Sequence, residues 1–243
     1  RSYMNDAKFF HKVLSPILQN LNNQGKPGVL NFSQGFPALE MLSYRPDQKE
    51  SIQDEKTLNE IKEKLLTSDI EFIWHPLGFI MGTLITEEKM KLRIHIWSKK
   101  YSKPQKPYWN IHTHIFHLKS WIISGSILNT LYEIEEVNES RNCIYEVHYK
   151  DNKSILKKSN KLINLINTNT LLHKKNDNYS IESGVFHSST LESTSALTIV
   201  LSTATDVKTP LVIGKKDYDN FNSKYNREKV NRNILFNILS ELE

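Results

Sequence analysis

The chain has 243 residues, of which 38% are hydrophobic and 24% charged, and its formal net charge is +5. This composition is typical of a folded globular protein and excludes a disordered or fibrous chain. No apolar run reaches the roughly 20 residues that a membrane helix requires. Basic residues are scattered along the chain, which argues against a nucleic-acid partner. The lone Cys143 cannot form an internal disulfide, and with no signal peptide pattern at position 1 we expect a cytoplasmic protein.

The first 70 residues read as helices and loops. Residues 4–21 place apolar side chains at helical spacing, although Pro16 should interrupt that run. The glycines and prolines of residues 25–37 predict a loop. A second helix is predicted over residues 55–67, where leucine and isoleucine form one stripe. We therefore expect residues 1–70 to be a helical extension that packs on the remainder of the chain.

From about residue 70 the apolar period changes from 3.6 to 2, which predicts strands. The predicted strand segments are residues 79–86, 90–98, 109–116, 121–136 with a bend or bulge at Gly125, 143–149, 178–187 and 195–203. The polar stretch 150–178 is interpreted as an exposed excursion with some strand content, and residues 226–242 as a helix. Short strands flanked by helices predict a mainly β fold, a barrel or sandwich over residues 71–215, followed by a C-terminal helical part over 216–243 within one structural domain.

Two histidines in the predicted strand 109–116 are the first candidate metal ligands. Period-2 geometry sends His112 and His114 to the same face of that strand. Their Cα atoms should lie roughly 6.5 Å apart, so both imidazoles can reach one metal at about 2.1 Å. The pair alone is also compatible with two partly exposed histidines that bind nothing.

The surroundings of this pair resemble the cupin superfamily, whose two motifs are G-x5-H-x-H-x3-4-E-x6-G and G-x5-P-x-G-x2-H-x3-N. His112 and His114 match the paired histidines, and Gly125 matches the closing glycine of the first motif. Gly184 and His187 match the G-x2-H of the second motif. The resemblance covers residues 72–213 and implies a jelly roll, the cupin-type double-stranded β-helix. It also implies that His112, His114 and His187 bind a metal.

The sequence departs from both motifs at several positions. Lys106 replaces the opening glycine, and Leu118 or Lys119 stands where the acidic ligand belongs. Glu182 replaces the proline of the second motif, and Leu191 replaces its asparagine. Without the acidic ligand, the pattern is similar to the three-histidine iron sites of thiol dioxygenase-like cupins.

This resemblance implies Fe(II), whereas the residue chemistry alone would accept Zn, Ni, Mn or Cu. Three neutral imidazoles leave the metal its full charge, which favours an anionic, chelating substrate. We therefore expect an iron-dependent oxygenase, a dioxygenase-like oxidoreductase acting on a small polar or anionic molecule. The alternatives are a non-catalytic cupin that binds a metal or small molecule, and a metal-dependent isomerase or lyase.

Further candidate site residues lie on neighbouring predicted strands. In residues 90–98, Arg93 and His95 share a face with Trp97, and isoleucines occupy the other face. If the first face points inward, Arg93 would bind a substrate carboxylate through a bidentate contact. His95 would then be a further metal ligand or a general acid or base. If the isoleucine face points inward, these residues lie outside the site.

Two other side chains are candidates for the same cavity. Tyr132 would donate a hydrogen bond to bound oxygen or substrate. His117 should face away from His114 unless a bulge intervenes. Besides the small-molecule substrate, we expect no membrane partner, and the apolar helices offer an interface through which two copies could form a homodimer.

Overall fold

The computed structural model describes residues 55–86, 88–218 and 223–243. The chain divides into two compact units, residues 1–69 with Glu243 and residues 70–242. The helix and loop predicted over 4–21 and 25–37 lie outside the described residues. The predicted division at residues 70 and 215 stays a prediction.

The helix predicted over residues 55–67 is confirmed as α3 (Glu55–Thr67). Its apolar stripe is almost fully buried, with Leu58, Ile61 and Leu65 exposing 3%, 1% and 0% of their surface. After the helix, the Ser68 hydroxyl donates a 3.1 Å hydrogen bond to the Leu65 carbonyl and so satisfies one of the terminal acceptors.

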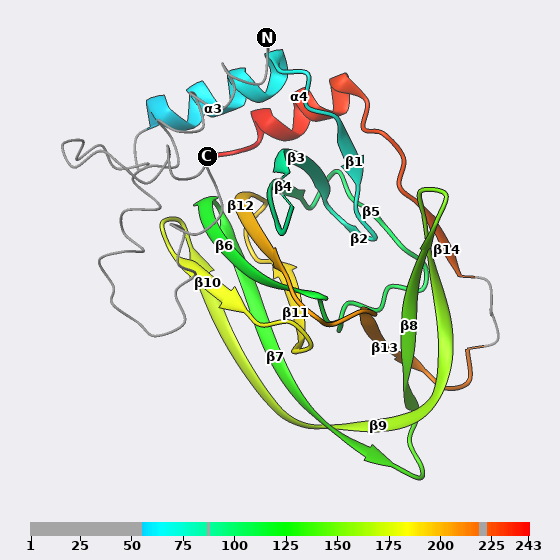
Figure 1. The fold of residues 1–243 in the computed structure, drawn as a ribbon. Helices are drawn as coiled ribbons and strands as arrows, with labels where there is room; N and C mark the ends of the chain where they lie inside the picture. The colour runs from blue at the N-terminus through cyan, green and yellow to red at the C-terminus, as the bar shows by residue number, and fades with distance from the viewer. Residues whose placement is uncertain (1–54, 87, 219–222) are drawn as a thin grey trace. The chain divides into compact units, whose positions relative to one another are not determined.

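The second unit consists mainly of antiparallel strands, which confirms the predicted mainly β fold of the jelly-roll type (Figure 1). One sheet contains, in spatial order, β1 (Phe72–Trp74), β3 (Ile80–Thr86), β4 (Met90–Ser98), β12 (Ser195–Ala204), β6 (Phe116–Ser124) and β10 (Asn178–Ile181). The other contains β11 (Phe186–Leu191), β7 (Ser126–Val137), β9 (Lys153–Lys174), β8 (Asn142–Lys150) and β13 (Leu211–Lys215), with β14 (Lys224–Asn226) paired to β9. A two-stranded sheet pairs β2 (Leu77–Gly78) with β5 (Lys103–Pro104).

The described sheets are not closed into a barrel, so the predicted barrel is wrong. The sheet that contains β12 ends at β1 and β10, and the sheet that contains β9 ends at β11 and β13. Alternation of apolar and polar residues identifies strands and their faces but carries no information on whether a sheet closes on itself.

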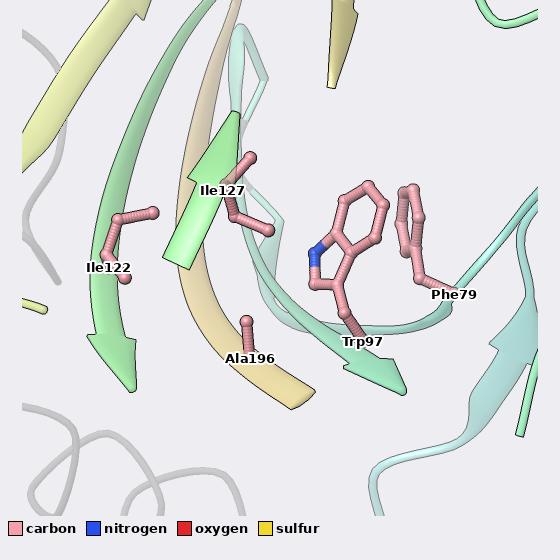
Figure 2. Close-up of a cluster of buried hydrophobic side chains, with 5 residues drawn as sticks. All are labelled: Phe79, Trp97, Ile122, Ile127 and Ala196. Carbon is pink, nitrogen blue, oxygen red and sulfur yellow. The ribbon is translucent and has the colours of Figure 1, made fainter. Parts of the chain in front are cut away.

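In the sheet that contains β12, the core lies along that strand. This strand pairs with β4 on one side and β6 on the other, and its first eight residues are buried. Burial on both faces explains why its sequence is nearly continuous in apolar and small side chains. Figure 2 shows one cluster of this core, in which the ring of Trp97 lies beside that of Phe79 at a centroid distance of 4.1 Å.

Several predicted elements differ from the structure. The strand predicted over residues 178–187 is divided between β10 and β11, which belong to different sheets. The stretch read as an excursion forms β9, a strand of 22 residues, because pairing with β7 and β8 supports its backbone while its polar side chains stay in water. Residues 109–115 form only isolated bridges, at His112, and Phe116 is already the first residue of β6. The C-terminal helix α4 (Arg232–Ser240) begins later than the predicted residue 226. Asn231 caps its start, because the Asn231 side chain accepts a hydrogen bond from the Asn233 amide. Neither helix in the described ranges meets the length and hydropathy of a membrane span.

Candidate metal centre

Backbone pairing brings the two histidine motifs together. The His112 amide donates to the His187 carbonyl, and the His187 amide donates to the His112 carbonyl, each at 3.0 Å. On the other side, the Thr113 amide donates to the Leu211 carbonyl at 2.8 Å. The segment that carries His112 is therefore fixed between the start of β11 and the start of β13.

The three imidazoles form one group. Their ring centroids lie 4.7 Å apart for His112–His114, 4.3 Å for His112–His187 and 4.8 Å for His114–His187. Each offers one ring nitrogen within 4.8 Å of the other two. Two nitrogens that share a cation at about 2.1 Å are at most about 4.2 Å apart, so small ring rotations bring these donors to binding distance.

Hydrogen bonds fix two of the three rings in a ligand-ready tautomer. The Nδ1 of His112 lies 2.8 Å from the Asn110 carbonyl, and the Nδ1 of His187 lies 3.2 Å from the Val185 carbonyl. A carbonyl only accepts, so each Nδ1 carries the proton and each Nε2 keeps a free lone pair. This is the arrangement in which imidazoles bind metals, with the other ring nitrogen anchored to an acceptor.

The environment also keeps these rings neutral. Burial, and secondly the nearby His112, lowers the pKa of His187 to about 3. Burial, followed by the neighbouring imidazoles, holds the pKa of His114 well below its usual value. Burial likewise lowers the pKa of His112, against the effect of its bond to Asn110. Neutral imidazoles are the metal-binding form, so no proton has to leave at pH 7.

The three histidines line a cavity of about 560 Å³ whose walls come from both large sheets. The sheet that contains β12 contributes side chains from β3, β4, β6, β10 and β12. The sheet that contains β9 contributes side chains from β8, β9, β11 and β13. This volume falls in the range of small-molecule sites. The cavity is thus large enough to hold a small molecule beside the histidines.

Arg93, His95 and Trp97 line this cavity, as expected if their face of β4 points inward. The alternate residues Leu92, Ile94 and Ile96 are buried on the other face of the strand. Burial, and secondly the charge of Arg93, lowers the pKa of His95 to about 3, so this ring is neutral. His95 does not belong to the metal-competent group found among the described residues.

Two functional candidates escaped the sequence analysis. His75 lines the cavity and stacks on Phe79 with a centroid distance of 4.2 Å and an interplanar angle of 9°. Its Nδ1 accepts a 3.1 Å hydrogen bond from the Leu77 amide, which places the ring proton on Nε2. Arg227 lines the same cavity from the segment after β14. The sequence does not single out Arg227, because the apolar spacing of residues 226–242 predicts that this segment begins a helix.

Tyr132 and His117 are not brought to the cavity. Tyr132 pairs with Phe186, one residue from His187, so it shares the Phe186 face of that sheet, and its hydroxyl lies 3.0 Å from the Ser188 Oγ. His117 is exposed, and its Nδ1 accepts a hydrogen bond from the Ser183 amide. Neither residue is in position to act with the three histidines.

No protein-family model and no curated protein matches the chain. Among solved structures, it is similar to an oxalate decarboxylase from Lactobacillus farciminis at 14% identity and a TM-score of 0.32, covering 58% of this chain and 35% of that one. It is also similar to an RmlC-like cupin from Shewanella frigidimarina (10% identity, TM-score 0.32, covering 57% and 86%). A third is a cupin-like protein from Thermotoga maritima (11% identity, TM-score 0.30, covering 64% and 87%). The chain thus spans about a third of the decarboxylase. Cupins are therefore among the solved structures to which this chain is similar.

Proposed function

We propose that this chain is a mononuclear metalloenzyme, an iron-dependent oxygenase that acts on a small anionic molecule. His112, His114 and His187 would hold the metal. The observation that carries the proposal is the donor set itself, in which three neutral imidazoles meet in one cavity and two present Nε2 with Nδ1 anchored to a carbonyl.

The donor set fits ferrous iron. Three nitrogen ligands leave coordination positions for substrate and dioxygen, and the group found among the described residues contains no carboxylate that would reduce the charge of the ion. When bound, the metal would supply one-electron chemistry with dioxygen and a positive charge that attracts an anionic substrate.

The chain's own residues would prepare the cavity for that reaction. The rings of Phe79, Trp97 and Phe116 form apolar parts of the wall, which limits the access of water to the reacting groups. Arg93 presents a guanidinium that would orient the substrate anion. His75, which lines the cavity with its proton on Nε2, would donate a hydrogen bond to the substrate.

Anaerobic reconstitution of the full chain with ferrous iron, followed by elemental analysis, tests the metal site. We expect one iron per chain, retained on desalting. Nitric oxide, a stand-in for dioxygen, should then give the electron paramagnetic resonance signal of a ferrous nitrosyl, because coordination positions stay open beside three imidazoles.

The matched variants are His114→Ala and His173→Ala. His173 lies in β9 beside Tyr179, outside the cavity, so its loss should leave the iron content unchanged. His114→Ala should lose the iron. A tightly held zinc that resists exchange, or iron that gives no nitrosyl signal, would argue for a binding module or an oxygen-independent enzyme instead.

A further inference from the structure

Two guanidinium groups line the proposed substrate cavity. Arg93 comes from β4, where its Nη1 donates to the Ser202 Oγ at 3.0 Å. Arg227 follows β14, and its Nε donates to the Ser154 Oγ at 3.3 Å. Within the described ranges, neither guanidinium forms an ion pair, and the buried Nε of Arg93 has no hydrogen-bond partner.

The same cavity contains both of these positive charges. Burial lowers the pKa of Arg93, and the charge of Arg227 is the second cause of that shift. A guanidinium nevertheless stays charged at neutral pH. Glu88 is the acidic residue of the described lining, and its side chain is exposed to solvent. The described cavity wall therefore carries unbalanced positive charge, which is costly unless a bound group supplies negative charge.

The ring of Phe116 lies near both the guanidinium of Arg93 and the ring of His114. Its ring stacks on His114 at a centroid distance of 4.7 Å, and the guanidinium carbon of Arg93 lies 5.8 Å from the same ring. The guanidinium carbon and the His114 ring are thus no more than 10.5 Å apart, the sum of these two distances. One small molecule can span that distance.

We propose that Arg93 and Arg227 form an oxyanion subsite that takes a doubly charged group of the substrate, of the phosphoryl type. This deepens the proposed function, on which it rests, by naming the substrate class as a small molecule with a phosphoryl tail and a donor for the metal. A phosphate monoester carries about −1.5 to −2 charges at pH 7 and three acceptor oxygens, which match two guanidinium forks. A single carboxylate would leave one of the two guanidinium charges unbalanced.

Isothermal titration of the metal-free full chain with inorganic phosphate tests this subsite. We expect saturable binding that weakens by about tenfold or more in Arg93→Gln and in Arg227→Gln, since each change removes one charged fork. Arg141→Gln, which removes an exposed arginine outside the cavity, should bind phosphate like the wild type. Acetate should bind the wild type at least about tenfold more weakly than phosphate.

The subsite would be overturned by no saturable phosphate binding, by equal loss of phosphate binding in Arg141→Gln, or by acetate binding as tight as phosphate. Because a cavity variant can unfold, phosphate is also titrated into thermal melts of the wild type, where a missing rise of Tm would equally overturn it. Iron content measured on the same variants separates the two proposals. Phosphate bound without iron binding would defeat the metalloenzyme alone, and iron bound without phosphate binding would defeat the subsite alone.

Discussion

Backbone carbonyls, rather than acidic side chains, orient two of the three candidate ligand histidines. His112 and His187 each place Nδ1 against the carbonyl of the residue two positions earlier, Asn110 and Val185. A carbonyl does not titrate and brings no charge into the cavity. The histidine group therefore adds no negative charge of its own, which leaves the charge of a bound cation available to an anionic substrate.

The burial of His95 predicts that the free energy of unfolding depends on pH. Its pKa is lowered to about 3 in the folded chain, against about 6.5 when unfolded. Between these values the unfolded chain binds more protons, so the free energy of unfolding falls as the pH is lowered from 6.5 towards 3. In urea titrations of the metal-free protein, His95→Phe should weaken this pH dependence by up to about 1.4 kcal/mol per pH unit, one proton's contribution.

The control for this prediction is His148→Phe, a substitution of an exposed histidine at the end of β8, with 48% of its side chain accessible. Its unfolding free energy should follow the wild type over the same pH range. If the slope of His95→Phe also follows the wild type, burial of His95 does not govern its protonation.

The bend between β6 and β7 gives a prediction at the scale of elements. Gly125 has φ +78°, and an added Cβ would lie 2.1 Å from the Ser195 carbonyl oxygen. Gly184 has a similar φ of +77° but open space around the same position. Gly184→Ala should lower the free energy of unfolding by about 1–2 kcal/mol, the cost of a left-handed L-residue, and Gly125→Ala by clearly more.

Chemical denaturation of both variants measures that difference. The comparison isolates the steric contact, because the two glycines share their backbone conformation. Equal losses of stability in the two variants would show that the backbone of β12 gives way to the new methyl group at little cost.

Strand β12 gives a second prediction at this scale. Leu197 is fully buried between β4 and β6, so Leu197→Ala should lower the free energy of unfolding by about 2–5 kcal/mol. Leu171 in β9 exposes 52% of its surface, and its replacement by Ala should change stability by about 0.5 kcal/mol or less. Urea titration of the two variants checks the contrast, and a similar effect of both would contradict the placement of the core.

The elements also show what the sequence could reveal. Residues 90–98 were predicted with the bounds of β4 because one face carries leucine and isoleucine while the other carries charged and aromatic residues. The polar composition of β9 does not predict a long strand, because its stability comes from pairing with β7, β8 and β14, which is a non-local property. The segment of His112 alternates like a strand, yet its partners are single residues of β11 and β13.

At the scale of the whole molecule, the cavity depends on how the two large sheets face each other. The histidine group was predictable because two short motifs carried it. Arg227 and His75 were not, since only the packing of distant segments brings them to the cavity wall. Tyr132 shows the same limit, because a strand's register decides which of two faces a side chain occupies.

Metal binding should stabilise the whole fold, because the ligands come from two segments that unfolding separates. With free ferrous iron at about 100 times its Kd, the free energy of unfolding should rise by about 2.7 kcal/mol. Anaerobic urea titrations with and without iron measure the difference. His112→Ala should show no such rise, and a rise equal to that of the wild type would place the stabilising site elsewhere.

The metal content of His112→Ala and His187→Ala tests the central claim most directly. After reconstitution and desalting, elemental analysis should find one metal ion per chain in the wild type and in the control His173→Ala, and none in the two variants. Metal retained in both His112→Ala and His187→Ala would contradict the claim that these imidazoles form the site.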